Sequence, residues 1–216
     1  SPEEAYEMIQ DAFSWSERFH RPVIFRPTTR ICHACAAIDT SGERRRNDPE
    51  GFVKDASKWV IFPRTAYQNH IKLEEQKEIL SAEFSSCRFN SLTGKGKLGI
   101  AAGGVSYQYA QEVLSSLPAG VSYSLLKIGT PTPFPEKLGL DFLNGVTDVL
   151  CLEELDPVIE TSLLLLCGKH HLPANIHGKL DGVTQKAGEN TVESAAQAIC
   201  QFLHIDQAVP NASKEA

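Results

Sequence analysis

The stretch Leu98-Gly-Ile-Ala-Ala-Gly-Gly-Val-Ser-Tyr107 decides the fold class of this chain. Five mostly apolar residues are typical of a buried strand, and the two glycines that follow permit a tight turn. Beyond the turn, apolar residues recur at the spacing of one helix face: Tyr107, Ala110, Val113, Leu114 and Leu117. The stretch therefore predicts a strand followed by an amphipathic helix.

The same alternation continues toward the end of the chain. The apolar pattern predicts strands at residues 125–128, 149–152 and 175–177, and helices at 136–143, about 158–166 and 192–203. Strands that alternate with helices in this way favour a mostly parallel sheet that is covered on both faces. The predicted fold class is α/β, with three αβα layers around this sheet.

The first part of the chain follows a different pattern. Residues 2–19 carry apolar side chains on one helix face, with Ser1 as the expected N-cap. Residues 23–25 predict a strand that leads into a polar, turn-like segment at 28–31. Residues 39–92 are interpreted as a bridge with a polar helix from about 71 to 84. Because Met8 is the only methionine and the chain opens at Ser1, we expect a piece of a longer protein.

The composition limits the class of protein. The chain has 216 residues, 42% hydrophobic and 22% charged, which is ordinary for a folded soluble protein. Its formal charge of -6 disfavours nucleic acid as a partner. No apolar run is long enough to span a membrane and no signal-peptide pattern is present, so we expect no membrane partner and a cytoplasmic location. The six scattered cysteines are expected to be reduced thiols.

Ligands of open parallel sheets bind beyond the carboxyl ends of the strands. Gly103 and Gly104 could present backbone N–H groups to an anion there, with Ser106 capping the next helix, although a plain tight turn explains the same residues. Glu153 and Glu154 could serve acid–base chemistry. Adjacent carboxylates at a strand end point in different directions, which favours a solvated or interface-bonded pair.

No other motif in the sequence indicates a class of reaction. The segment Cys32-His-Ala-Cys35 has the spacing of a metal or redox site, but no second Cys-x-x-Cys accompanies it. Cys167 with His170, His171 and His177 is explained by a helix end, so no metal site is predicted. Hydrolase, P-loop and zincin motifs are absent from the sequence.

Several whole segments, taken in order, carry a more specific signal. They are Pro22-Val-Ile-Phe-Arg-Pro-Thr-Thr-Arg-Ile-Cys-His33, Gly103-Gly-Val-Ser-Tyr-Gln-Tyr-Ala110, Pro133-Phe-Pro-Glu-Lys-Leu138, Val149-Leu-Cys-Leu-Glu-Glu-Leu-Asp-Pro157, Ile159-Glu160, Ile176-His-Gly-Lys179 and Gly188-Glu189. Together they resemble the alpha subunit of indolepyruvate ferredoxin oxidoreductase from about residue 2 to 205.

The resemblance implies a division of the chain into domains. Residues 1–45 are similar to the end of a pyrimidine-binding domain, and residues 46–94 would be a connecting region. Residues 95–205 resemble a transketolase C-terminal-like domain, and residues 206–216 would be a linker.

The resemblance also implies an activity for the parent protein. Enzymes of this family use thiamine diphosphate and magnesium to decarboxylate aryl 2-oxoacids such as indolepyruvate. Electrons pass through iron–sulfur clusters to ferredoxin, and the product is an aryl-acetyl-coenzyme A. The implied partners are the rest of the alpha subunit, a beta subunit and ferredoxin, in a homo- or hetero-oligomer.

The cofactor-binding motifs of the family have no match in this chain. The thiamine-activating glutamate, the Gly-Asp-Gly diphosphate site and the cluster cysteines belong to other parts of the subunit, so we expect no catalytic residue and no bound cofactor here. Arg30 and His33 match the family's Thr-Thr-Arg-x-x-His segment and are candidates for contacts with substrate or a subunit interface. Cys35 and the segment 130–135 depart from the family pattern, which leaves the preferred 2-oxoacid open.

Two other interpretations of the chain remain. It could be a free-standing, flavodoxin-like module that binds a small ligand or a regulator at the turn of Gly103 and Gly104. It could also be purely architectural, serving subunit contacts in an assembled enzyme.

Overall fold

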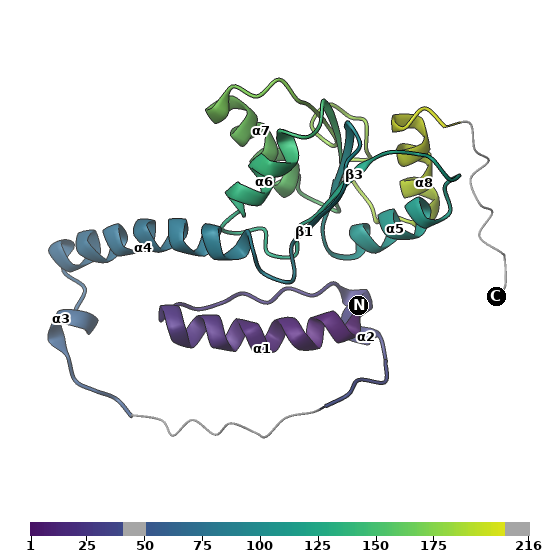
Figure 1. Cartoon of the computed structure of the whole chain (residues 1–216). Coiled ribbons are helices and arrows are strands. Elements are labelled where there is room, and N and C mark those ends of the chain that lie inside the picture. Colours follow the sequence, from purple (N-terminus) through teal and green to yellow (C-terminus); the bar gives the residue numbers. More distant parts are fainter. Residues whose placement is uncertain (41–50, 206–216) are drawn as a thin grey trace. The chain divides into compact units, whose positions relative to one another are not determined.

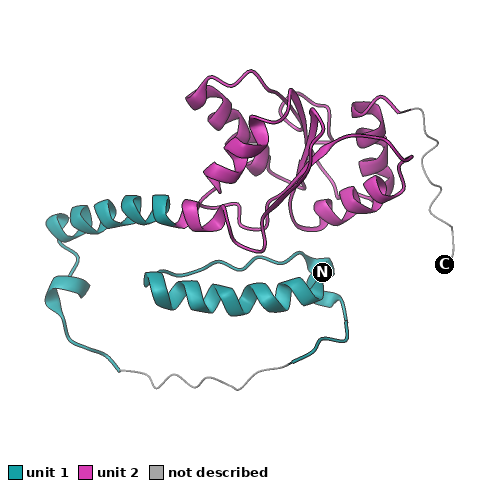
Figure 2. Cartoon of the chain, viewed as in Figure 1, with its two compact units in different colours: residues 1–79 teal, residues 80–216 magenta. Residues whose placement is uncertain are grey.

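The computed structural model describes residues 1–40 and 51–205 (Figure 1). The chain divides into two compact units, Ser1–Ile79 and Leu80–Ala216 (Figure 2). The linker predicted at residues 206–216 lies outside the described residues, as does the part of the predicted domain boundary that falls at 41–50. No described helix is both long and apolar enough to cross a membrane.

The first unit is helical in its described residues. It contains α1 (Pro2–Phe19), α2 (Thr29–His33), α3 (Ala56–Trp59) and most of α4 (Pro63–Phe84). The expected cap of α1 is confirmed, because the Ser1 hydroxyl accepts a hydrogen bond from Glu4 N at 3.3 Å. The side chain of Gln76 on α4 forms two hydrogen bonds at the end of α1. It accepts from Arg21 Nε at 2.6 Å and donates to Phe19 O at 3.3 Å.

The strand predicted at residues 23–25 is wrong. Residues 21–28 form no regular element. The turn-like segment expected at 28–31 is the start of a helix, because Thr28 is the N-cap of α2 and residues 29–31 are its first three residues. A strand needs a neighbour to satisfy its backbone groups, and no strand occurs among the described residues of the first unit. Apolar β-branched residues alone did not decide the conformation.

The second unit is built on one five-stranded sheet. Its strands are β1 (Ser91–Gly94), β2 (Leu98–Ala102), β3 (Ser124–Lys127), β4 (Asp148–Leu152) and β5 (Asn175–His177), in the order β1-β3-β2-β4-β5. Four strands are mutually parallel, and only β1 runs antiparallel to its neighbour β3. The helices are α5 (Gly104–Ser115), α6 (Glu136–Leu143), α7 (Val158–His170) and α8 (Val192–Phe202). The predicted α/β class with a mostly parallel sheet is confirmed.

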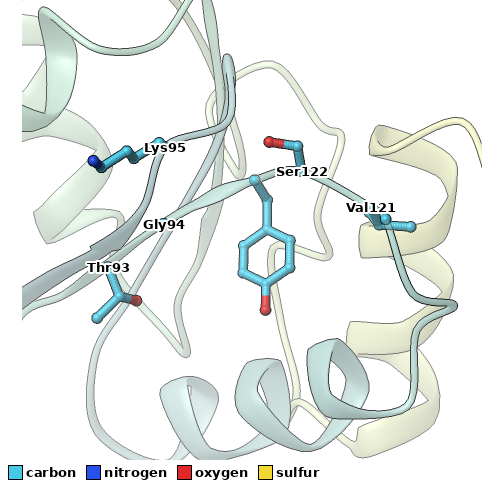
Figure 3. Close-up of a pocket in the computed structure, with 7 residues that line it drawn as sticks. Thr93, Gly94, Lys95, Val121 and Ser122 are labelled. Carbon is cyan, nitrogen blue, oxygen red and sulfur yellow. The ribbon is translucent and has the colours of Figure 1, made fainter.

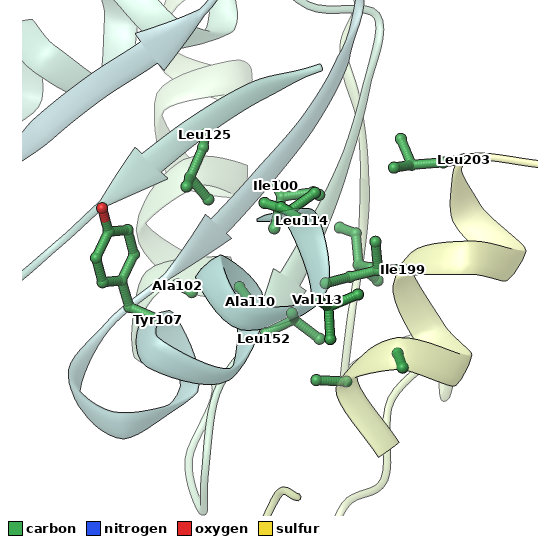
Figure 4. Packing of buried hydrophobic residues seen from close by; sticks show 13 residues of the cluster. Ile100, Ala102, Tyr107, Ala110, Val113, Leu114, Leu125, Leu152, Ile199 and Leu203 are labelled. Carbon is green, nitrogen blue, oxygen red and sulfur yellow. The ribbon is translucent and has the colours of Figure 1, made fainter. Parts of the chain in front are cut away.

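Alternating residues of the strands send side chains to two separate cores. On one face, Ile100 and Leu152 pack under α5 and α8 with Ala110 and Ile199, as Figure 4 shows. On the other face, the neighbouring strand residues pack with buried side chains of α6 and α7. Burial on both faces explains the nearly continuous apolar runs from which the strands were predicted.

The strand β1 and the start of α4 also differ from the sequence-based expectation. The strand β1 was not predicted, because Ser91-Leu-Thr-Gly94 is short and half polar, and it exists through its pairing with β3 at the sheet edge. Helix α4 begins at Pro63 and not near residue 71. Proline is favoured in the first turn of a helix, where its missing N–H has no partner to lose.

Candidate functional site

The chain reverses its direction of travel across the sheet between β2 and β4. From β2 it crosses to β3 on one side, and from β3 it crosses to β4 on the other side of β2. Ligands of open α/β sheets bind at such a switch point, beyond the carboxyl ends of the strands. Gly103 directly follows β2 and Glu153 directly follows β4, so the structure brings these predicted site residues to one edge.

The two glycines of the turn have different structural reasons. Gly103 is the N-cap of α5, and a Cβ there would lie 2.5 Å from the carbonyl oxygen of Ile128. Gly104 has a φ of +55°, which favours glycine, but a Cβ there would meet no atom within 4 Å. Close packing and backbone conformation therefore account for both residues without a ligand.

Ser106 does not cap α5, contrary to the expectation from the sequence. It lies inside the first turn of the helix and is buried. Its hydroxyl accepts a hydrogen bond from the side-chain amide of Asn190 at 3.0 Å. The same amide nitrogen donates to Glu153 O at 3.2 Å, so Asn190 links the first turn of α5 to the residue that follows β4.

Glu153 binds the start of α7. Its two carboxylate oxygens accept from Ile159 N at 2.7 Å and Glu160 N at 2.9 Å, which satisfies backbone groups that have no partner inside the helix. Burial raises the pKa of the Glu153 carboxyl, against the opposing effect of these two hydrogen bonds, and the nearby Glu160 raises it further.

Glu154 points elsewhere and accepts a hydrogen bond from Asn190 N at 3.0 Å. The two adjacent carboxylates thus diverge, as the strand geometry predicted. Both are bonded inside the second unit, whereas the favoured expectation was a solvated or interface-bonded pair.

Two further buried charged residues, which were not predicted as site residues, lie beside this edge. Glu160 is buried and accepts from the backbone N–H groups of Lys179 at 2.8 Å and Leu180 at 3.1 Å. Lys179 is also buried, and its ammonium group donates to Gln185 O at 2.6 Å. Together these bonds fasten the loop from Gly178 to Asn190 against α7.

We name Ser106, Glu153, Glu154, Glu160, Lys179 and Asn190 the edge cluster. Each of its side chains has a hydrogen-bond partner inside the second unit. Within residues 1–40 and 51–205, no group of three or more His, Cys, Asp or Glu residues could hold a metal ion. The cluster is built to fasten loops and helices.

A hollow of about 410 Å³ lies at a different place, where β1 ends and β3 begins (Figure 3). Residues 93–95 and 120–123 line it, and Lys95 is its one charged residue. The surrounding backbone is held by hydrogen bonds from Gly96 N to Tyr123 O and from the Ser124 hydroxyl to Gly96 O. Its lining contains no histidine, cysteine or carboxylate.

The remaining predicted site residues, Arg30 and His33, lie in the first unit. Both belong to the short helix α2, three positions apart on one face, and both side chains are exposed. The exposed thiols of Cys32 and Cys35 lie beside them. These positions suit contact with another surface.

Comparisons with solved structures found distant likenesses. A split-gene transketolase aligns with 55% of this chain and 42% of its own length, at 17% identity and a TM-score of 0.42. The 2-oxoglutarate:ferredoxin oxidoreductase of Magnetococcus marinus aligns with 66% of this chain and 24% of its own, at 15% identity and a TM-score of 0.47. No protein-family model matches the chain.

Comparisons with curated proteins found relatives of higher sequence identity. The chain is 37% identical over 215 residues to the indolepyruvate oxidoreductase subunit IorA of Thermococcus kodakarensis, and 35% identical over 202 residues to that of Methanothermobacter thermautotrophicus. The IorA subunit of Pyrococcus horikoshii is 34% identical over 214 residues. These alignments cover 92% to 95% of this chain, which spans about a third of the length of each relative. Nearly the whole chain is therefore related to one part of the IorA subunit of indolepyruvate oxidoreductases, which confirms the resemblance found in its sequence.

Proposed function

We propose that this chain is the part of an indolepyruvate ferredoxin oxidoreductase alpha subunit that joins and positions the catalytic parts. The parent enzyme would oxidatively decarboxylate aryl 2-oxoacids such as indolepyruvate to aryl-acetyl-coenzyme A and pass the electrons to ferredoxin. The observation that carries the proposal is an alignment over more than nine-tenths of the chain. Three IorA subunits align in this way, at 32% to 37% identity.

The two units support a role in assembly. In the second unit, the side chains at the edge where α/β proteins usually bind ligands are bonded to the unit itself. In the first unit, Ala12 is the only buried residue among residues 1–40 and 51–79. A segment with so little core gains its stability by packing against other protein, which supports the rest of the alpha subunit as its partner.

The cofactors of such an enzyme would be thiamine diphosphate, magnesium, iron–sulfur clusters and coenzyme A. The described residues do not fit a metal or cluster site, since none of their His, Cys, Asp and Glu side chains form a suitable group. The sequence contains no Gly-Asp-Gly segment, and only Cys32 and Cys35 are closely spaced cysteines. The cofactor sites of the parent would therefore lie in its other parts, and no reaction step is assigned to this chain.

Arg30 and His33 would face the assembled active site or a subunit interface of the parent. Their exposure on α2 supports this placement. The domain boundaries at 45, 94 and 205, the beta subunit as a partner and the cytoplasmic location are further parts of the same proposal.

The direct test uses the full-length subunit that contains this sequence, assembled with its beta subunit. We expect indolepyruvate- and coenzyme A-dependent reduction of ferredoxin, and no such activity from residues 1–216 alone. A complex that carries its cofactors but does not reduce ferredoxin with any aryl 2-oxoacid would overturn the proposed activity.

A second test addresses the location of the cofactor site. Thiamine diphosphate with magnesium should raise the Tm of the full subunit and leave that of residues 1–216 unchanged, because a ligand stabilises only a protein that binds it. A shift of several degrees, about the effect of 1 kcal/mol or more in a chain of this size, would place a cofactor site inside this chain.

A free-standing binding module is less well supported. The turn at Gly103 and Gly104 is explained by packing and conformation, without a ligand. A phosphate titration of residues 1–216 that shows saturable binding would revive this alternative.

A further inference from the structure

Residues 52–62, which we name the aromatic segment, expose large apolar side chains to an unusual degree. Ile61 is 88% exposed and Phe52 78%, and Val53, Trp59 and Phe62 are each more than half exposed. Scattered apolar side chains are normal on a protein surface, but a concentration of five within eleven residues marks a site of interaction.

Local contacts give this segment a defined conformation. The carboxylate of Asp55 caps the short helix α3 by accepting from Ser57 N at 2.9 Å and from the Ser57 hydroxyl at 2.7 Å. The Trp59 ring lies 6.0 Å from the ring of Phe52, measured between centroids, and its indole N–H donates to Val53 O at 3.0 Å. The segment is thus organised before it meets a partner, which lowers the entropy lost on binding.

The same contacts prepare the aromatic side chains for burial. The indole N–H is the only polar group of the Trp59 side chain, and its acceptor, Val53 O, lies inside the segment. Burying the ring therefore leaves no unsatisfied donor. Tryptophan residues that fill apolar pockets are typical of the positions that carry most of the binding energy of an interface.

The charges around the segment define its partner further. Within residues 52–62, Lys54 and Lys58 outnumber Asp55, so the segment is slightly basic in a chain with a formal charge of -6. The ammonium group of Lys58 lies over the Trp59 ring, 4.7 Å from its centroid. A complementary surface would be apolar at its centre and acidic at its rim.

We propose that the aromatic segment anchors this chain to an apolar, acid-rimmed surface of the same polypeptide, in the two thirds of an IorA-like subunit that this chain does not include. The proposal rests on the proposed function only in its choice of occupant. That choice follows from the relatives, which are three times as long as the matched part, and from the first unit, in which Ala12 is the only buried residue described. Lys54 and Lys58 would also attract an anionic membrane, and the vesicle experiment below distinguishes that occupant from the proposed one.

The first experiment compares residues 1–216 with the full-length subunit by hydroxyl-radical footprinting. We expect oxidation of Phe52, Trp59 and Phe62 to fall at least about fivefold in the longer protein, as the side chains pass from exposed to core-like surroundings. Phe89, which is 1% exposed, is the internal standard for a buried ring. Equal oxidation in both proteins would overturn the proposal.

The second experiment uses substitutions. The pair Ile61→Asp and Phe62→Asp should leave the Tm of residues 1–216 nearly unchanged, because both side chains are exposed there. In the full-length subunit the same pair should lower the Tm by several degrees and restore oxidation of Trp59. Leu165→Asp on α7, an exposed apolar position of the second unit, is the matched control, and an equal effect of this control would argue against a specific anchor.

Two outcomes separate this inference from the proposed function. If the subunit lacks oxidoreductase activity but protects the segment, the anchor stands and the activity falls. If the segment becomes protected only when vesicles containing phosphatidylglycerol are added, its partner is a membrane surface and the anchor proposal falls.

Discussion

The side-chain amide of Asn190 donates a hydrogen bond to the hydroxyl of Ser106 across 84 positions of the sequence. Asn190 precedes α8 and Ser106 lies in α5, the two helices that cover one face of the sheet. The bond joins the first turn of α5 to the loop before α8, near the carboxyl ends of β2 and β4 where ligands of such sheets usually bind. Asn190 and Ser106 therefore have a structural role, because their hydrogen bond connects two parts of the second unit.

Replacement of Asn190 by alanine tests this connection. Asn190→Ala removes the donor to Ser106 and to Glu153 O in a buried place, so we expect the free energy of unfolding to fall by about 1–3 kcal/mol. Urea denaturation of residues 1–216 measures it. Gln111→Ala, at an exposed position of α5, is the control and should change the stability by less than about 0.5 kcal/mol.

The raised pKa of Glu153 gives a pH dependence with a defined sign. A carboxyl whose pKa is higher in the folded than in the unfolded protein binds its proton more tightly when folded, so its contribution to stability falls as pH rises through the folded value. Relative to Glu153→Gln, which does not titrate, the wild type should gain stability on acidification from neutral pH toward the ordinary value of 4.5. Urea denaturation of both proteins at several pH values measures this gain, and a wild type that loses stability relative to the variant on acidification would contradict the burial argument.

Asp181 should behave in the opposite way. Partial burial would raise the pKa of its carboxyl, but hydrogen bonds from Gly178 N and His177 outweigh burial and the pKa is lowered. The stability that it contributes is present above its ordinary value of 3.8 and is lost as pH falls through the lower folded value. Asp181→Asn should therefore reduce the loss of stability in acid, as followed by circular dichroism. A steeper acid transition in the variant would refute this prediction.

The two glycines of the turn should respond differently to alanine. Gly103→Ala places a Cβ 2.5 Å from a backbone oxygen that cannot move freely, and we expect a loss of about 2–3 kcal/mol. Gly104→Ala meets no atom within 4 Å and incurs only the strain of a positive φ, about 1 kcal/mol. Thermal unfolding of both variants checks the order. Equal losses would mean that the turn is not packed against Ile128 as described.

The sequence by itself determined the alternation of strands and helices in the second unit. The predicted helix at 136–143 coincides with α6, and the strands at 125–128 and 149–152 overlap β3 and β4 almost entirely. These elements were readable because each strand is buried on both faces and each helix on one, so burial imposes its period directly on the apolar residues. The family was also recognisable from ordered segments of sequence.

Only the tertiary structure decided where polar residues act. Ser106 was expected as a helix cap and became an acceptor for Asn190, while Glu160 and Lys179 were not singled out, because their partners lie far along the chain or are backbone groups of a loop. The strand predicted at 23–25 is absent and the unpredicted strand β1 is present for the same reason. A strand depends on a neighbour that satisfies its backbone hydrogen bonds, and whether one is present is settled by the fold, not by local residue preference.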